Sequence, residues 1–387
     1  MSSEQVFKQL ARDTGEGRGL PNHAFTSDAF LELENTLLFP RSWLLAGTGS
    51  DVPNVGDAAL AEFGAGSLIL LHGSDEQIRV FHNVCPHRGA RLLDEPMRAA
   101  NALTCPYHAW SFDLDGNLKG RPHYDGPGRH DHGQEQGNER VCLFEVRSHQ
   151  WGDWIFVNLD GQAVEFETEM EAILRRFDGY PLHEFRCAHR QSFEFACNWK
   201  LAVENYNDVY HVFKIHPALD KMHVASDRYP MTVDGRHLCN GYSFEGPGRG
   251  LTVDEDGPAL PTLTHLKDDD RNRMQWATLF PNTAINIYPS NLQLIRFLPK
   301  GPHRTQMQMW FYFVGDAATD ETTREAREAL YREWANLNAE DEDVCRRMQL
   351  GRGCNAYDGG RFAPYWDSGT LHFHREVAKA VSENVLE

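Results

Sequence analysis

Apolar and polar positions alternate in different ways along the chain, and the changes divide it into three segments. Residues 1–42 are predicted to be mainly helical, because Thr26, Ser27 and Asp28 can cap a run with one apolar face. From Trp43 onward the apolar runs become short and are separated by turn residues, which indicates strands. The runs predicted to be strands here are 67–71, 78–81, 109–112 and 154–157. This segment is therefore predicted to be a small β-rich domain.

Helical and strand patterns alternate in the segment that follows. Three runs with strand character fit a single sheet, and two longer stretches have helical spacing. The strand runs are 285–288, 292–297 and 305–314, and the helical stretches are 198–217 and the residues after 319. Residues 246–273 are rich in Gly, Pro and Asp and are predicted to be a long loop, either a lid or a disordered segment. The predicted fold class is α+β.

Composition fits this organisation. The chain of 387 residues is long enough to bury two hydrophobic cores. We expect residues 43–160 to form the small domain, residues 161–387 to form the larger one, and residues 1–42 to pack on the larger one. Charged residues make up 24% of the chain and the mean hydropathy is −0.54, values typical of a soluble globular protein.

Charge and cysteine usage narrow the function classes. A formal net charge of −18 argues against nucleic-acid binding. No apolar run approaches the roughly 18 residues of a membrane span, and the N-terminus lacks the apolar centre of a signal peptide. Eight cysteines without regular spacing are typical of a reducing compartment rather than a disulfide framework. We therefore expect a cytoplasmic protein that binds neither nucleic acid nor a membrane.

Two short loops of the β-rich segment each offer one thiolate and one imidazole. Cys85 and His87 form the first pair, and Cys105 and His108 form the second. Two cysteines and two histidines can hold a tetrahedral zinc ion. They can also hold a [2Fe–2S] cluster, in which one iron binds both thiolates and the other binds both imidazoles. The spacing alone does not distinguish a zinc site from a [2Fe–2S] site.

A second group of metal-binding residue types lies in the predicted helix 198–217. Glu204, Asp208 and His211 are spaced i, i+4 and i+7, which places them on one face of a regular helix. Imidazoles and carboxylates together suit a divalent first-row metal. The alternative is an interior helix whose histidines are satisfied by hydrogen bonds.

His216 can join this group only if the helix changes its course. It follows His211 by five residues, which is about 140° around a regular helix. One ion can bind both histidines only if the helix loosens or ends near Lys214, and Pro217 fits an end there. Two histidines and one carboxylate are the facial ligand set of non-haem Fe(II) oxygenases.

The last long helix supplies a candidate for the third ligand. Its apolar stripe advances in steps of three and four with one gap, and Asp341 occupies the gap. A carboxylate that faces a core is costly unless it is paired or metal-bound. Asp341 is therefore the candidate ligand and Asp343 the second choice, while a cap or a buried ion pair is the other role open to Asp341. The stripe consists of Ala326, Leu330, Trp334, Leu337, Val344 and Met348.

Both motifs resemble those of a known family. CPHRGA and CPYHAWSFDLDG are similar to a Rieske iron–sulfur motif, and NWKLAVENYNDVYHVFKIHP is similar to the catalytic iron motif of Rieske non-haem iron oxygenase large (α) subunits. The similarity of pattern extends from about residue 20 to the C-terminus, with a departure at Ala109, where many relatives have glycine. The resemblance implies that Asp208 hydrogen-bonds a cluster histidine of the neighbouring subunit and passes electrons to the iron. The implied ligands are Cys85, His87, Cys105 and His108 for the cluster and His211, His216 and Asp341 for the iron.

The resemblance also implies a fold and partners. It implies a small Rieske [2Fe–2S] domain and a catalytic domain whose antiparallel sheet is flanked by helices, in the helix-grip, START-like arrangement. It implies a homotrimeric terminal oxygenase that uses O2 and mononuclear Fe(II). The chain has no strand-linked G-x-G-x-x-G motif for a nicotinamide or flavin. Electrons from NAD(P)H are therefore expected to arrive through a separate reductase or ferredoxin.

The C-terminal sequence points to a substrate class by resemblance. EDEDVCRRMQLGRG, YDGGRF and LHFH are similar to choline, glycine betaine and carnitine monooxygenases. This implies hydroxylation of a methylated ammonium compound, which then loses formaldehyde. The alternative substrate is an aromatic ring or aromatic acid, with Arg296 or Arg273 as the partner of the carboxylate. A different class of function also stays open, namely an electron-transfer protein or a zinc-stabilised binding protein without oxygenase activity. Aromatic residues available for a cation box, or for core packing, are Tyr206, Tyr210, Trp276, Phe280, Tyr288 and Trp310.

Overall fold

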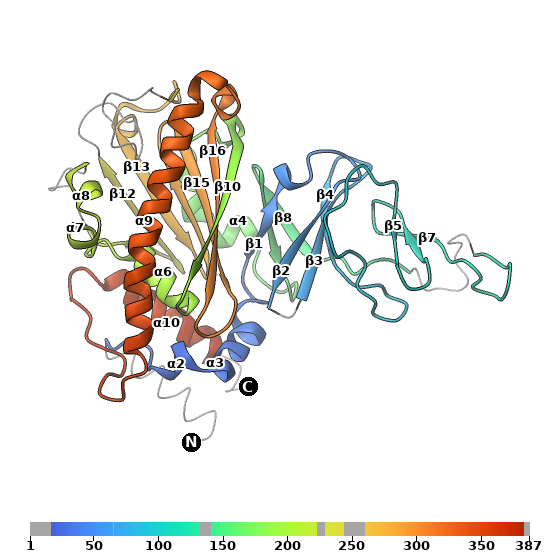
Figure 1. The fold of residues 1–387 in the computed structure, drawn as a ribbon, viewed down its shortest axis with the longest axis horizontal. Coiled ribbons are helices and arrows are strands. Elements are labelled where there is room, and N and C mark those ends of the chain that lie inside the picture. The colour runs from blue at the N-terminus through green and yellow to red at the C-terminus, as the bar shows by residue number, and fades with distance from the viewer. Residues whose placement is uncertain (1–16, 65, 132–140, 223–228, 244–259, 383–387) are drawn as a thin grey trace. The chain divides into compact units, whose positions relative to one another are not determined.

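The computed structural model describes residues 17–64, 66–131, 141–222, 229–243 and 260–382. The chain divides into two compact units (Figure 1). One unit comprises Trp43–Ala163, and the other combines Met1–Ser42 with Val164–Glu387. Both units contain strands, and the larger one adds long helices, which confirms the predicted α+β class.

The smaller unit consists of three small antiparallel sheets, with strand orders β1–β9–β8, β2–β3–β4 and β5–β6–β7. Three of the four predicted strand runs are confirmed as β3, β4 and β9. The run 109–112 is a strand only at Ser111–Phe112, because Ala109 adopts a φ of +56°, which is incompatible with extended backbone. The strands are β1 (Leu44–Thr48), β2 (Ala58–Phe63), β3 (Gly66–His72), β4 (Ile78–His82), β5 (Leu103–Thr104), β6 (Ser111–Phe112), β7 (Leu118–Gly120), β8 (Arg147–Trp151) and β9 (Trp154–Asn158).

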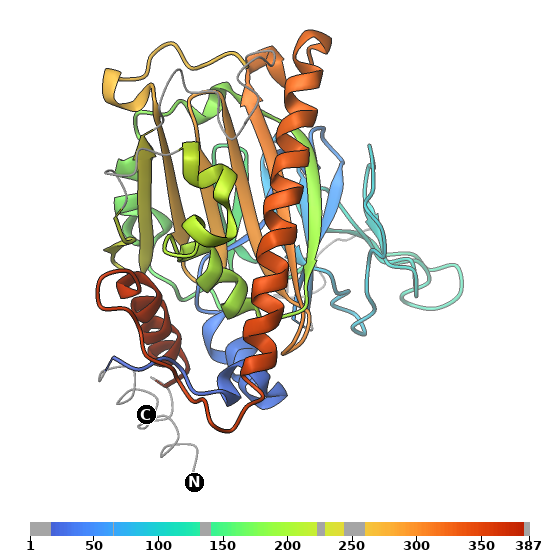
Figure 2. The ribbon, with the colours of Figure 1, turned by 60° about the vertical axis from the view of Figure 1, so that its left-hand side comes forward.

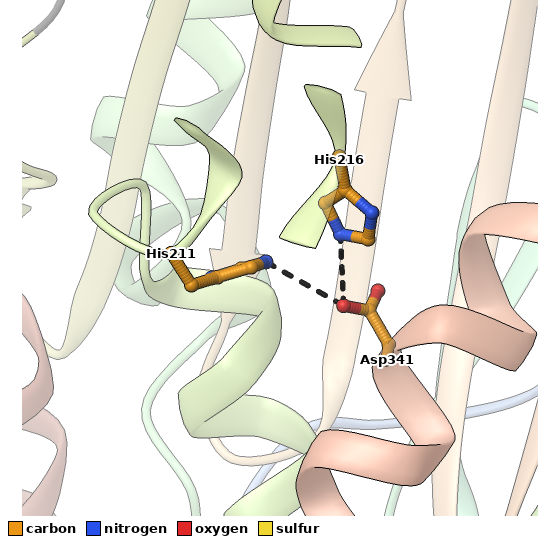
Figure 3. A group of neighbouring side chains, drawn as sticks. All are labelled: His211, His216 and Asp341. Carbon is orange, nitrogen blue, oxygen red and sulfur yellow. Dashed lines mark hydrogen bonds and ion pairs between the residues drawn. The ribbon is translucent and has the colours of Figure 1, made fainter. Parts of the chain in front are cut away.

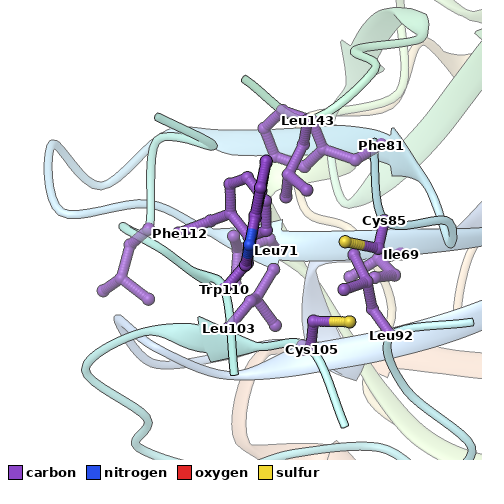
Figure 4. Close-up of a cluster of buried hydrophobic side chains, with 12 residues drawn as sticks. Ile69, Leu71, Phe81, Cys85, Leu92, Leu103, Cys105, Trp110, Phe112 and Leu143 are labelled. Carbon is purple, nitrogen blue, oxygen red and sulfur yellow. The ribbon is translucent and has the colours of Figure 1, made fainter. Parts of the chain in front are cut away.

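The apolar core beneath the cluster loops includes both motif cysteines. Ile69 and Leu71 of β3 and Phe81 of β4 belong to the same buried group as Cys85 and Cys105 (Figure 4). Close packing of this kind fixes side-chain positions, because neighbouring groups leave few alternative rotamers. The core therefore holds the two sulfur atoms in defined places.

The larger unit is organised around one seven-stranded antiparallel sheet of order β10–β16–β15–β14–β13–β12–β11. The three predicted strand runs of this domain are confirmed as β14, β15 and β16. The central strands are buried on both faces, which explains their long apolar runs. The strands are β10 (Phe185–Phe195), β11 (Thr232–Asp234), β12 (His237–Ser243), β13 (Arg273–Leu279), β14 (Thr283–Ile287), β15 (Asn291–Pro299) and β16 (Thr305–Val314).

One face of this sheet carries the helices that concern function. The long helix α9 (Arg324–Gly351) crosses it, and α6 (Trp199–Asn207), α7 (Val212–Ile215) and α8 (Pro217–Met222) lie beside α9 (Figure 2). The side chain of Asp320 accepts a hydrogen bond from the N–H of Thr322 and so caps a short 3₁₀ turn (Glu321–Thr323) that precedes α9. Other α-helices of this unit are α4 (Phe166–Glu169), α5 (Glu171–Phe177) and α10 (Ser368–Ser382).

The described part of the N-terminal segment is helical. It contains α2 (His23–Thr26), α3 (Asp28–Leu33) and a π-helical turn (Glu34–Leu38), and Ser27 caps α3 as predicted by accepting a hydrogen bond from the N–H of Phe30. The buried Glu34 carboxylate accepts hydrogen bonds from Lys200 (2.6 Å) and from the Trp199 indole (2.9 Å) of α6. These bonds connect the N-terminal segment to α6, the first helix of the second motif.

Half of the predicted loop 246–273, residues 246–259, lies outside the described residues, so its alternatives, a lid or a disordered segment, both stay predictions. Its last residues form a short 3₁₀ turn, Asp268–Asp270, before β13. Among the described residues no helix is both long and apolar enough to cross a membrane.

Candidate metal centres and substrate pocket

The two cysteine loops of the smaller unit share one backbone design. The N–H of Cys85 donates to the carbonyl of Ala90 (2.7 Å), and the N–H of Cys105 donates to the carbonyl of Trp110 (2.8 Å). In each loop the N–H four residues after the cysteine donates back to the cysteine carbonyl (3.0 Å in both). Two loops with the same hydrogen bonds hold the backbone of their cysteines in the same way.

Both loops also need a left-handed residue at the same position. Gly89 has a φ of +71°, which glycine adopts without steric cost, and Ala109 has a φ of +56°. The Cβ atom of Ala109 makes this conformation unfavourable by about 1 kcal/mol. The departure from the family pattern at Ala109 therefore costs stability but leaves the loop geometry intact.

The four predicted cluster ligands divide into an inner and an outer pair. Cys85 and Cys105 are buried, whereas His87 and His108 are exposed and their ring centroids lie 4.8 Å apart. The ring of His87 stacks on Trp110 at 4.4 Å, which holds its plane. Burial raises the pKa of the Cys85 thiol, and the adjacent Cys105 raises it further, while backbone N–H groups of His87 and Arg88 lower it by hydrogen bonding. Paired thiolates inside and paired imidazoles outside fit a two-iron cluster with unlike ligands on its irons.

The second motif does not form one helix as predicted. Asn198 caps α6, which ends at Asn207, and Asp208 is extended (φ −90°, ψ 116°) before α7 begins. The Asp208 carboxylate accepts hydrogen bonds from the N–H groups of Tyr210 (2.6 Å) and His211 (3.2 Å). A short acidic side chain that binds nearby backbone in this way competes with helix continuation. The predicted end of the helix near Lys214 is confirmed, because α7 ends at Ile215, but the helix also breaks earlier, at Asp208.

A second interruption brings His216 toward His211. The helix α7 ends at Ile215, and His216 takes a non-helical conformation (φ −116°, ψ 65°). Pro217 follows this end closely, as predicted, and it also begins a new helix, α8, where proline is tolerated at a first helical position. The breaks on either side of α7 replace the single loosening that the spacing required.

Because the helix breaks early, Glu204 does not share a face with His211. Its Oε1 accepts a hydrogen bond from Nε2 of His374 in α10 (2.7 Å), and Nδ1 of that histidine accepts one from the N–H of Leu20 (2.9 Å). Arg352 lies near the other carboxylate oxygen at 3.8 Å. Glu204 and His374 thus join α6, α10 and the N-terminal segment, a role for the second histidine of the LHFH run that its sequence did not reveal.

His211, His216 and Asp341 meet in the larger unit (Figure 3). Nε2 of His216 lies 2.9 Å and Nε2 of His211 lies 3.5 Å from the same oxygen, Oδ1 of Asp341. One ligand atom from each of the three residues lies within 4.8 Å of the others. Two imidazole nitrogens and one carboxylate oxygen at these separations fit a first-row divalent ion with open positions opposite them.

Each histidine of this group is held from behind by a carboxylate. Nδ1 of His211 lies 3.2 Å from Oδ2 of Asp208, and Nδ1 of His216 lies 2.7 Å from Oε2 of Glu340. Such contacts fix the tautomer that leaves Nε2 free for a metal. Glu340 directly precedes the candidate ligand Asp341 in the sequence. Nothing in the sequence assigns it this function, because Glu340 and His216 are 124 residues apart.

Charge around the group favours a cation. Burial lowers the pKa of His211, but hydrogen bonds and charge from Asp208 and Asp341 outweigh it and raise this pKa to about 9. Burial raises the pKa of Asp341, and the two histidines outweigh it and lower this pKa to about 2. Asp343, the second choice for the third ligand, instead pairs with Arg346 and Arg347 away from the group.

A pocket with about 610 Å³ of empty space, its mouth included, adjoins these three residues. Trp334 and Leu337 precede Asp341 on the same face of α9, so this part of the predicted apolar stripe lines the pocket. Three of the six candidate aromatic residues line it as well. The pocket residues are Asn205, Tyr206, Asp208, His211, Val212, His216, Leu219, Met274, Trp276, Asn286, Tyr288, Trp334, Leu337 and Asp341.

The other three aromatic candidates lie elsewhere. Tyr210 is exposed and stacks on Trp366 at 5.5 Å, Phe280 packs under the Arg236 guanidinium, and Trp310 has arginine guanidinium groups over its ring. These residues therefore do not form part of a cation box in this pocket.

Neither arginine proposed for an aromatic acid lines the pocket. Arg296 donates to Oε1 of Gln308 through Nε and an Nη atom, and Arg273 donates to the carbonyl of Gly241 and the hydroxyl of Tyr229. Both guanidinium groups thus have partners in the protein.

Known families match most of the chain. The family model described as Ring hydroxylating alpha subunit (catalytic domain) matches residues 182–383, and that of the Rieske [2Fe-2S] domain matches residues 42–130. The carnitine monooxygenase oxygenase subunit of Escherichia coli (strain K12) is 28% identical over 377 residues, covering 94% of each chain. The glycine betaine monooxygenase oxygenase subunit of Pseudomonas aeruginosa (strain PAO1) is 26% identical over 417 residues, covering 100% of this chain and 94% of the relative.

Solved structures have the same fold. The quaternary ammonium Rieske monooxygenase CntA in complex with L-carnitine superposes with a TM-score of 0.76 at 22% identity, covering 94% of this chain and 95% of the other. Naphthalene 1,2-dioxygenase from Rhodococcus sp. gives a TM-score of 0.77 at 16% identity, covering 98% of each chain. A zinc-stabilised binding module does not account for these matches. The chain belongs to the ring-hydroxylating oxygenase α-subunit family, with a Rieske [2Fe–2S] domain ahead of a catalytic non-haem iron domain.

Proposed function

We propose that this terminal oxygenase hydroxylates a methyl group of a small quaternary ammonium compound. The observation that carries the proposal is the pocket beside the candidate iron site. The rings of Tyr206, Trp276 and Tyr288 line it together with the carboxylates of Asp208 and Asp341, and its described lining contains no lysine or arginine. Aromatic faces and carboxylates both attract a cation that carries no N–H donors. Relatives named for carnitine and glycine betaine support the same class.

The proposed reaction balances with O2 and two electrons. A methyl C–H bond is replaced by C–OH, the second oxygen atom leaves as water, and two protons are consumed. The product, an N-hydroxymethyl ammonium compound, then releases formaldehyde and a proton and leaves a tertiary amine. The chain thus acts as an N-demethylating monooxygenase, and the iron supplies O2 activation when it is bound.

The metal-binding roles follow from the geometry. His211, His216 and Asp341 would hold the mononuclear iron through Nε2, Nε2 and a carboxylate oxygen, while Asp208 and Glu340 orient the two rings. Cys85, His87, Cys105 and His108 would hold the [2Fe–2S] cluster, the cysteines inside and the histidines toward solvent. The aromatic walls orient the substrate methyl toward the open side of the iron site and exclude water from it.

Electrons would reach the iron through Asp208 from a second copy of the chain. The Asp208 side chain remains 28% exposed, and next to it lie the exposed rings of Tyr210 and Phe213. The candidate cluster histidines are also exposed, so a cluster of one subunit can approach Asp208 of another. We therefore favour a homotrimer in which each cluster serves the neighbouring iron.

The electrons themselves would come from NAD(P)H through a separate reductase or ferredoxin, because the sequence has no dinucleotide motif. All eight cysteines lie among the described residues and none forms a disulfide, which fits the reducing cytoplasm as the compartment.

Mixing two inactive variants tests the route between subunits. Chains with Cys85→Ala lack a cluster, and chains with His211→Ala lack an iron ligand. Co-expressed chains should regain turnover if electrons cross the interface, and oligomer mass by light scattering should give three copies. Mixed oligomers that stay inactive would contradict the route.

A single turnover tests the reaction itself. The protein with both iron centres is reduced chemically and mixed with O2 and one panel of compounds, either methylated ammonium compounds or aromatic acids. We expect formaldehyde and the demethylated amine from the first panel, identified by mass spectrometry. Hydroxylated ring products from the second panel alone would instead support ring hydroxylation.

A further inference from the structure

Two hydrogen-bond donors of the pocket lining have no acceptor in the described protein. They are Nδ2 of Asn286 in β14 and Nε1 of Trp334 in α9. Asn286 is 2% exposed, and Trp334 lies two helical turns before Asp341 on the same face of α9. The sheet and the helix thus each bring one free donor to the pocket.

The orientation of the Asn286 amide is fixed by its other end. The hydroxyl of Tyr206 donates to Oδ1 of Asn286 at 2.5 Å. Burial raises the pKa of Tyr206 well above its usual value, so the phenol keeps its proton and remains the donor. Oδ1 therefore faces Tyr206, and Nδ2 is left without a partner. Asn286 also pairs with Trp276 across β13 and β14, so the amide stands beside an aromatic wall.

An unpaired buried donor is unfavourable. It costs about 1–3 kcal/mol, and more than 90% of buried polar groups in proteins have a partner. Two such donors at one pocket favour a ligand atom that accepts hydrogen bonds and donates none. A carboxylate oxygen is the strongest acceptor of this kind. A compound with a carboxylate alone would be repelled by Asp208 and Asp341, whereas a zwitterion carries its own balancing cation.

We propose that Asn286 and Trp334 bind the carboxylate of a zwitterionic substrate, whose quaternary ammonium end lies against the aromatic walls. The inference rests on the proposed function and narrows it from methylated ammonium compounds in general to ammonium carboxylates. Asn286 and Trp334 are then the residues that set specificity, while the iron ligands perform the same chemistry on any methyl group placed beside them.

Equilibrium binding tests the proposal without turnover. Calorimetry compares the holoprotein's affinity for (3-carboxypropyl)trimethylammonium with that for butyltrimethylammonium, which has a similar size but no oxygen. The wild-type protein should bind the carboxylate compound at least about tenfold more tightly, as expected for two hydrogen bonds to a charged group. Trp334→Phe removes only the indole donor and part of the ring, and Asn286→Asp replaces the donor by an acceptor. Trp334→Phe should reduce the preference about tenfold and change butyltrimethylammonium binding less than about twofold. Asn286→Asp should reduce the preference at least about tenfold by weakening binding of the carboxylate compound, without weakening binding of butyltrimethylammonium.

Trp310→Phe is the matched control. The indole nitrogen of Trp310 also has no acceptor among the described residues, but Trp310 lies outside the pocket, so this variant should keep the full preference. Cluster absorbance and iron content establish that each variant is folded and loaded. Equal wild-type binding of the two compounds, or variants that weaken both compounds equally, would overturn the proposal.

Single-turnover product analysis separates this proposal from the proposed function. If both compounds yield formaldehyde but bind with equal affinity, the proposed demethylating activity is supported and the proposed carboxylate site is refuted. If the carboxylate compound binds more tightly and this preference depends on Asn286 and Trp334, but neither compound yields formaldehyde, the carboxylate site is supported and the demethylating activity is refuted.

Discussion

The two candidate metal centres are built in opposite ways. The cluster loops take each thiolate and imidazole from one short run, and backbone hydrogen bonds within the run shape it. The iron site takes its ligands from elements far apart in sequence, since His216 and Asp341 are 125 residues apart. The first centre therefore depends mainly on local backbone conformation. The second depends on tertiary packing and on carboxylates that hold the histidine rings.

The largest expected effects come from removing one ligand of each centre. Cys85→Ala should abolish the absorbance of the cluster, whereas His211→Ala should keep this absorbance and abolish turnover. Visible spectra and single-turnover assays check both. A His211→Ala protein that still forms product would refute the assignment of this histidine.

Removing the third ligand should have a nearly equal effect. Asp341→Ala leaves two imidazoles without the carboxylate that meets both, so mononuclear iron and turnover should be lost while the cluster remains. Asp343→Asn is the control, because its carboxylate pairs with arginines away from the site and should be dispensable. Metal analysis of both proteins distinguishes the two positions, and iron retained in Asp341→Ala would argue for a purely structural carboxylate.

The carboxylates behind the histidines should have intermediate effects. Glu340→Gln removes the charge behind His216 and should lower iron affinity about 10–100-fold, measured by competition with a chelator. Asp208→Asn acts on His211 in the same way. Because the cluster delivers its electron through this residue, the variant should also lower both steady-state turnover and single turnover of reduced protein with its iron loaded. Full steady-state activity of Asp208→Asn would rule out the route through this residue.

The smallest effects concern the backbone of the cluster loops. Ala109→Gly should raise the free energy of unfolding by about 0.5–1 kcal/mol, because glycine adopts a positive φ without the Cβ penalty. Gly89→Ala is the mirror experiment and should lower this free energy by about 1 kcal/mol, since an added Cβ has no neighbour within 4 Å and only the backbone strain remains. Thermal unfolding followed by cluster absorbance measures both, and equal midpoints would show that the φ angles do not limit stability.

Much of this molecule was predictable from sequence because the relevant signals are local. The strands β3, β14, β15 and β16 follow from apolar runs of the right length, and the caps at Ser27 and Asp320 follow from side chains that bind backbone two or three residues away. The doubled Cys and His pattern likewise lies within two short loops. Family matches across both domains agree with these motifs.

The sequence by itself thus determined the types of most elements and the candidate ligands. It also singled out Asp341, because this carboxylate lies on an otherwise apolar stripe. Only the tertiary structure decided that the motif helix breaks at Asp208, that Glu340 supports His216, that Glu204 belongs to His374, and which aromatic rings line the pocket. The physical reason is distance along the chain. Helical and strand periodicity report which face a side chain occupies, whereas its partner across the fold depends on how separate elements pack.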